Sequence, residues 1–184
     1  MYVNSKHELN VAEQRYSGNC DARPDSADVC LLVLHNITLP PGDDRVDYID
    51  ALFCNTLDCS AHPSFSGLEN QRVSAHLLIC RDGTILQYVA FDKRAWHAGA
   101  SSWNGRSSCN NFAIGVELQG TDTQAYEDIQ YNVLAEVVRA LFRQYPQLSL
   151  SHIVGHQEIA PGRKTDPGSS FDWQRLYSEI DVTR

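Results

Sequence analysis

Runs of apolar residues separated by polar segments predict the strands of this chain. The run 29–35 is apolar at successive positions, which is typical of a strand covered on both faces of a sheet. Further strand-like runs occur at 74–80, 84–90, 112–119 and 152–155. Arg81-Asp82-Gly83 joins the runs 74–80 and 84–90 and predicts a β-hairpin.

Apolar residues three and four positions apart predict helices between these strands. The clearest helix covers 125–145, where one apolar stripe is formed by Ile129, Val133, Leu134, Val137, Val138, Leu141 and Phe142. The same spacing predicts a helix over 46–57, and Asp172 can cap a last helix. Because strands and helices interleave, we expect an α/β fold: a single domain with a mixed central β-sheet flanked by helices.

Length, composition and charge are those of one globular domain. A chain of 184 residues can bury one core, so we expect a single domain over 1–184, with the core at about 28–180 and an irregular segment at 1–27. The net charge of -8 argues against a nucleic-acid partner. No stretch is apolar enough to span a membrane, and the N-terminus does not resemble a secretory signal. We therefore expect a cytoplasmic monomer with free thiols.

Candidate metal ligands occur at the end of the first strand and in a loop near the C-terminus. His35 ends the run 29–35, and His156, Lys164 and Asp166 lie in a loop rich in Gly and Pro. Two imidazoles and one carboxylate are typical ligands of a catalytic Zn²⁺, which activates water at neutral pH. Spacing alone leaves the pair of histidines open. Any two of the following could hold the metal: His35, His76, His97, His152 and His156.

Each of these residues also has a purely structural interpretation. His35 could be a hydrogen-bonded histidine of the core. Asp166 precedes Pro167, which favours extended geometry, and extended geometry places Lys164 and Asp166 on the same side of the chain. Lys164 and Asp166 could therefore form a surface salt bridge in a turn.

Glu117 is unusual because it lies within an apolar strand. Alternation along 112–119 places Glu117 on the same face as Ala113 and Gly115. Burial without a nearby cation raises the pKa of a carboxyl group toward neutrality, and the small neighbours leave room for a substrate or a water molecule. These conditions favour a general base. The alternative is a glutamate on an edge strand that faces water.

Several motifs together resemble one enzyme family. The motifs are Leu34-His35-Asn36, Ser74-Ala75-His76, the segment 94–99, the segment 110–120, and Gly155-His156 through Asp166-Pro167-Gly168 with Phe171-Asp172-Trp173. Over about 28–175 the chain is similar to the AmpD-type 1,6-anhydro-N-acetylmuramyl-L-alanine amidases, in a wider group that includes phage amidases and peptidoglycan recognition proteins. The resemblance implies a mixed sheet flanked by helices.

The resemblance also implies a role for each candidate residue. His35, His156 and Asp166 would hold one Zn²⁺ per chain, Glu117 would be the catalytic acid/base, and Lys164 would stabilise the oxyanion. The substrate would be an anhydromuropeptide released during cell-wall turnover. The bond that is cut would join the lactyl carbonyl of the muramyl sugar to L-alanine.

The residues expected to contact substrate are Asn36, Arg72, Trp96, His97 and Arg106. Relatives often carry a basic residue where this chain has Ser108. If that residue binds the peptide carboxylates, either Arg106 or Arg72 takes its place in this chain, or the affinity is lower. Two other classes of function stay open: a muropeptide-binding module without catalysis, and a zinc peptidase that cuts between amino acids. The complete set of ligands, with Glu117 and Lys164, favours the amidase over both.

Overall fold

A mixed sheet forms the centre of the computed structural model, which describes residues 1–181. Its strands follow the order β1–β5–β4–β9–β3–β10. Their bounds are β1 Glu13–Gln14, β3 Leu31–Ile37, β4 Leu77–Ile79, β5 Ile85–Gln87, β9 Ala113–Gln119 and β10 Ile153–Gly155. β4 and β5 pair antiparallel as the predicted hairpin, and the other neighbours pair parallel. The predicted mixed sheet is therefore confirmed.

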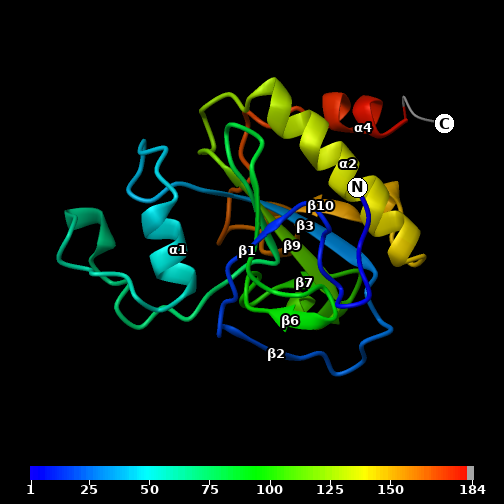
Figure 1. Cartoon of the computed structure of the whole chain (residues 1–184), viewed down its shortest axis with the longest axis horizontal. Coiled ribbons are helices and arrows are strands. Elements are labelled where there is room, and N and C mark those ends of the chain that lie inside the picture. The colour runs from blue at the N-terminus through cyan, green and yellow to red at the C-terminus, as the bar shows by residue number, and fades with distance from the viewer. Residues whose placement is uncertain (182–184) are drawn as a thin grey trace.

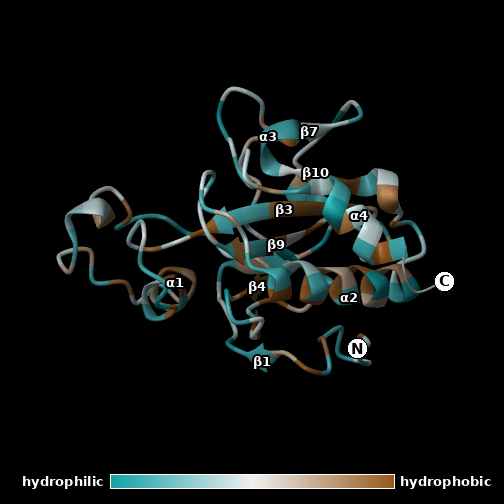
Figure 2. Ribbon diagram, turned by 90° about the horizontal axis from the view of Figure 1, so that it is seen from above, coloured by the Kyte–Doolittle hydropathy of each residue, from teal (hydrophilic) through white to brown (hydrophobic). Residues whose placement is uncertain are grey.

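Two helices cover one face of this sheet, α2 (Asp128–Gln144) and α4 (Trp173–Asp181) (Figures 1 and 2). The stripe predicted for 125–145 forms the α2 side of the main core, although Ile129 in the first turn is exposed. Leu134 and Val138 pack there with every second residue of β3 and β9, such as Leu34 and Val116. The backbone N–H of Arg175 donates to Asp172, which confirms the predicted cap of the last helix.

The opposite face is covered by a helix and by loops. α1 (Asp47–Phe53), predicted over 46–57, packs on the β4–β5 hairpin. The rest of this face is covered by the segment 98–112 and by the short helix α3 (His156–Ile159). Residues 91–111, predicted as one long loop, contain β6 (Lys93–Ala95), β7 (Ser102–Trp103), β8 (Arg106–Ser107) and a 3₁₀ turn η2 (Cys109–Asn111). Two more 3₁₀ turns are η1 (Pro63–Phe65) and η3 (Leu150–His152).

The N-terminal segment is less irregular than the sequence predicts. β1 adds an edge strand beside β5, and β2 (Cys20–Ala22) pairs antiparallel with β6. Strands of two or three residues are too short to leave a periodic signal in the sequence. All six cysteines lie in the described part of the chain as free thiols, and Cys30 and Cys80 are buried as expected. No helix within residues 1–181 is long and apolar enough to cross a membrane.

Arg23 joins the N-terminal segment to both ends of the loop 91–111. Its side chain is buried, with 6% exposed, and burial lowers its pKa to about 10. The guanidinium group donates to the carbonyl oxygen of Phe91 at one end of the loop, and to those of Asn110 and Asn111 at the other. It also donates to the carbonyl oxygen of Ala113 in β9. Arg23 therefore fixes where this loop leaves and rejoins the sheet.

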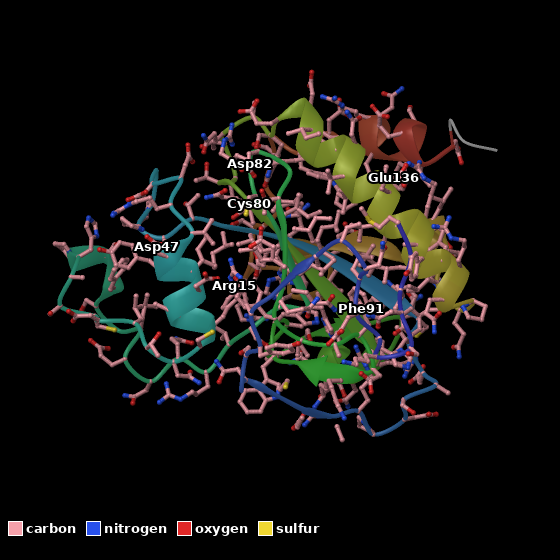
Figure 3. The ribbon with its side chains drawn as sticks, in the orientation of Figure 1. Arg15, Asp47, Cys80, Asp82, Phe91 and Glu136 are labelled. Carbon is pink, nitrogen blue, oxygen red and sulfur yellow. The ribbon has the colours of Figure 1, made fainter. Side chains whose placement is uncertain are left out.

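We expect Arg23→Met to destabilise the protein by about 3 kcal/mol or more, because it leaves several buried carbonyl groups without donors. The free energy of unfolding in urea measures this effect. Arg15→Met is the matched control. Arg15 lies beside α1 and forms only partly exposed ion pairs (Figure 3), so its loss should cost less than about 1 kcal/mol. Equal losses in the two variants would contradict the structural role of Arg23.

Candidate metal centre

His35 and Glu117 lie side by side on the sheet face opposite α2. β3 and β9 pair in parallel register, with Val33 beside Gly115 and His35 beside Glu117. Paired residues of neighbouring strands project to the same face. Both side chains are buried, with 2% of His35 and 9% of Glu117 exposed. The alternative of an edge-strand glutamate is wrong, because β9 lies between β4 and β3.

The chain brings His156 to His35 through the pairing of β10 with β3. Gly155 of β10 lies beside Leu34, so His156, the next residue, starts α3 at the level of His35. The loop that follows α3 then returns to the sheet. A Cβ at Gly155 would lie 2.8 Å from Cδ of Pro167, so a glycine here allows the loop to approach. This approach places Asp166 beside both histidines.

Three side-chain atoms converge at this point. Nδ1 of His35 lies 2.9 Å from Nδ1 of His156, and Oδ2 of Asp166 lies 2.9 Å and 3.0 Å from these two nitrogens. No other group of three His, Cys, Asp or Glu side chains converges in this way within residues 1–181. Of the five histidines left open by the sequence, His35 and His156 are therefore the pair that meets a carboxylate.

The surroundings of these three side chains suit the binding of a metal cation. Nε2 of His156 lies 3.1 Å from the carbonyl oxygen of Ala98, which can only accept, so a proton on this nitrogen would leave the lone pair of Nδ1 available to an ion. Burial lowers the pKa of His35 to about 4, although the hydrogen bond to Asp166 acts in the opposite direction. His35 is therefore neutral at pH 7. Burial would raise the pKa of Asp166, but its hydrogen bonds to the two histidines lower it below its usual value. Two imidazoles and a carboxylate are a donor set for a divalent metal ion.

Glu117 presents a carboxylate oxygen beside this cluster. Its Oε2 is buried and has no hydrogen-bond partner among the described residues. Burial raises the pKa of Glu117 well above its usual value, the charge of Asp166 raises it further, and Lys164 opposes both. A buried carboxyl group with a raised pKa is suited to accept a proton from water and to return it.

A groove of about 480 Å³ opens beside the cluster. Its lining includes Asn36, Asp122, Arg163, Lys164 and Asp166. In the part of the chain that the structure describes, Lys164 forms no ion pair, because Asp166 is held by the two histidines. The alternative of a Lys164–Asp166 salt bridge is therefore wrong, and an exposed ammonium group lies at the groove.

Of the five residues expected to contact substrate, two lie at the cluster or its groove, and three make contacts elsewhere. His97 contacts His35 directly, and Asn36 lines the groove while donating to Asp122 and to the carbonyl oxygen of Pro167. The other three are engaged elsewhere. Arg72 lines a different cavity, Trp96 donates to Asp21, and Arg106 pairs with Asp28 and stacks 3.8 Å from the ring centre of Phe112.

Two residues that support the site were missed by the sequence analysis. Oδ1 of Asn110 accepts from the backbone N–H groups of His97 and Ala98. Arg163 donates to the carbonyl oxygens of Ala98 and Ala100, and so holds the loop 91–111 against the loop that carries Lys164. Their partners are backbone atoms, which leave no pattern of residue types in the sequence.

A mixed sheet with a buried carboxylate beside three converging metal-ligand side chains is the arrangement of a hydrolytic enzyme. The chain belongs to the N-acetylmuramoyl-L-alanine amidase family, whose model matches residues 25–169. It is 58% identical over 172 residues to the 1,6-anhydro-N-acetylmuramyl-L-alanine amidase AmpD of Citrobacter freundii, covering 94% of this chain and 91% of that protein.

Solved structures of the same family have the same fold. The crystal structure of a selenomethionine derivative of AmpD superposes with a TM-score of 0.94 at 53% identity, over 98% of this chain and 99% of that one. The amidase AmiD from Escherichia coli, solved with the substrate anhydro-N-acetylmuramic acid-L-Ala-D-γ-Glu-L-Lys, has a TM-score of 0.60 at 26% identity. That match covers 94% of this chain and 60% of AmiD. The predicted family and fold are confirmed.

Proposed function

We propose that this protein is a zinc-dependent amidase that cuts the amide bond between the lactyl group of 1,6-anhydro-N-acetylmuramic acid and L-alanine of the stem peptide. The observation that supports this most is the convergence of His35, His156 and Asp166 beside Glu117. The likeness to AmpD over nearly the whole chain supports the choice of substrate. The free thiols suit the cytosol, where the enzyme would recycle cell-wall fragments as a monomer.

Zinc is the metal that this set of ligands fits best. Nδ1 of His35, Nδ1 of His156 and Oδ2 of Asp166 would hold the ion, which leaves a fourth position free, as in catalytic zinc sites. When bound there, Zn²⁺ supplies a Lewis acid that polarises a carbonyl group and lowers the pKa of water.

Glu117 carries the proton transfers in the proposed reaction. Its carboxylate takes a proton from the attacking water as the water oxygen bonds to the lactyl carbonyl carbon. It then gives this proton to the nitrogen of L-alanine as the C–N bond breaks, and a free lactyl acid and an amine result. Because burial raises the pKa of Glu117 above its usual value, this carboxylate is a stronger base than an ordinary glutamate.

Lys164 would stabilise the negative charge that develops on the lactyl carbonyl oxygen. Its ammonium group lies at the groove without a competing ion pair among the described residues. A donor of this kind is worth about 3–4 kcal/mol in the transition state. The substrate contacts of Asn36, Arg72, Trp96, His97 and Arg106 remain predictions.

We expect Lys164→Met to lower kcat and kcat/KM together by roughly 10²–10³-fold, with substrate affinity nearly unchanged, because the contact exists only in the transition state. Steady-state kinetics measures this change. Lys6→Met, which removes an exposed ammonium group outside the groove, is the control and should be unaffected. If Lys164 instead binds a peptide carboxylate, KM alone rises. An unchanged kcat would rule out the oxyanion role.

Product analysis tests the proposed bond. The enzyme is incubated with 1,6-anhydro-N-acetylmuramyl tripeptide, and the products are identified by mass spectrometry. We expect free anhydro-N-acetylmuramic acid and the intact tripeptide. A muramyl-alanine product would indicate a peptidase, and binding without any product would indicate a binding module. Either result would contradict the proposal.

A further inference from the structure

His97 fills the space between the metal centre and the buried centre of the sheet. Its Nδ1 lies 3.0 Å from Nε2 of His35, and the two rings meet edge to face with centroids 5.1 Å apart. On its other side, the ring of His76 lies 5.7 Å away. The ring also lies over Gly115, where a Cβ would come within 2.5 Å of Cγ of His97. This position of β9 therefore accommodates His97 because it has no side chain.

The contact with His97 decides which nitrogen of His35 carries the proton. Nδ1 of His35 faces His156 and Asp166, and Nε2 faces His97. A metal ion needs the lone pair of Nδ1, so a neutral His35 must then carry its proton on Nε2. That proton requires an acceptor, because Nε2 is buried. Nδ1 of His97 is the acceptor within reach.

The opposite tautomer of His35 would compete with the metal. With the proton on Nδ1, His35 would donate to Oδ2 of Asp166 across 2.9 Å. Two of the three ligand atoms would then be occupied by one hydrogen bond. Which tautomer prevails depends on whether Nδ1 of His97 acts as acceptor or as donor.

Among the described residues, the ring of His97 has one hydrogen-bond partner, His35. His76 cannot accept a proton from it, because Nδ1 of His76 accepts from the N–H of Gly115, and Nε2 contacts the carbonyl oxygen of Lys93. The guanidinium group of Arg23 lies 3.1 Å from that same Nε2. Nε2 of His97 is buried and has no partner within residues 1–181. Among these groups, His35 is the one that His97 can serve.

We propose that His97 is a positioning residue of the metal centre: by accepting the proton of Nε2, it holds His35 in the tautomer whose Nδ1 can bind the ion. The proposal rests on the zinc centre proposed above. It gives His97 a role in metal binding beside the contact with substrate that the sequence predicts. Hydrogen-bonded partners of ligand histidines commonly change metal affinity by roughly 10–100-fold.

Two variants of His97 separate the hydrogen bond from packing. His97→Leu removes the acceptor, and His97→Asn keeps an oxygen near the place of Nδ1. Zn²⁺ affinity is measured by competition with a chelating dye, on metal-free protein. We expect the leucine variant to bind Zn²⁺ roughly 10–100-fold more weakly than wild type, and the asparagine variant to bind nearly as tightly as wild type. His152→Leu removes a histidine outside the cluster and should not change the affinity.

Two outcomes would overturn the proposal: wild-type affinity in His97→Leu, or equal losses in His97→Leu and His97→Asn. A wild-type protein that fails to bind Zn²⁺ would instead contradict the proposed function itself. A second measurement needs no variant. Nitrogen–proton correlation spectra of the histidine rings in zinc-loaded wild type should show His35 protonated on Nε2 and His97 unprotonated on Nδ1. A proton on Nδ1 of His97 would overturn the proposal.

Discussion

Asp166→Ala is expected to purify without bound zinc. The substitution removes the one charged ligand and leaves two neutral imidazoles, which together form a weak site. Zn²⁺ binds to structural sites with four ligands with a free energy of about 10–16 kcal/mol. Losing one ligand should therefore weaken binding by several kcal/mol, or at least ~100-fold in affinity. Metal analysis of the purified variant measures the loss, and activity should fall with it.

The neighbouring carboxylate of Asp122 provides the matched control for this experiment. Asp122 lines the same groove, but its side chain accepts from Asn36 and does not belong to the cluster. Asp122→Ala should therefore keep its zinc. Full zinc occupancy in Asp166→Ala, with His35→Ala also unaffected, would mean that the proposed ligands are wrong.

Glu117→Gln is expected to bind both zinc and substrate but to turn over roughly 10²–10⁴-fold more slowly, the usual range for loss of a general base. Glutamine has the shape of the glutamate side chain but cannot take the proton of the attacking water. Because Glu117 provides none of the converging ligand atoms, the variant should keep its metal.

Steady-state kinetics and metal analysis of the same preparation test this prediction. Glu127→Gln changes an exposed carboxylate at the start of α2 and should keep normal turnover. A Glu117→Gln enzyme with nearly normal kcat would remove Glu117 from the mechanism. Loss of zinc from the variant would indicate that Glu117 supports metal binding instead of acting as the base.

The sequence predicted the parts of this fold that depend on local pattern. The stripe of the helix α2 is long enough for its period to be unambiguous, and the short continuous apolar run ending at His35 is typical of a covered strand. The unusual position of Glu117 was also visible, because alternation placed it beside Gly115 on the face that the structure assigns to it.

The parts that the sequence did not predict depend on contacts between distant segments. The pairing of β10 with β3 decides which histidines meet Asp166, and no spacing along the chain encodes that pairing. The short strands β1 and β2 pair with β5 and β6, which lie far away along the chain. Arg23 and Asn110 bind backbone atoms, so their roles have no signature in residue types.

Removal and return of the metal tests the central claim most directly. The wild-type enzyme is stripped with a chelator and then given one equivalent of Zn²⁺, and release of anhydro-N-acetylmuramic acid from an anhydromuropeptide is measured at each stage. The account predicts that activity is lost on stripping and recovered with zinc in wild type, while stripped Asp166→Ala stays inactive. Full hydrolysis by the metal-free enzyme would contradict it.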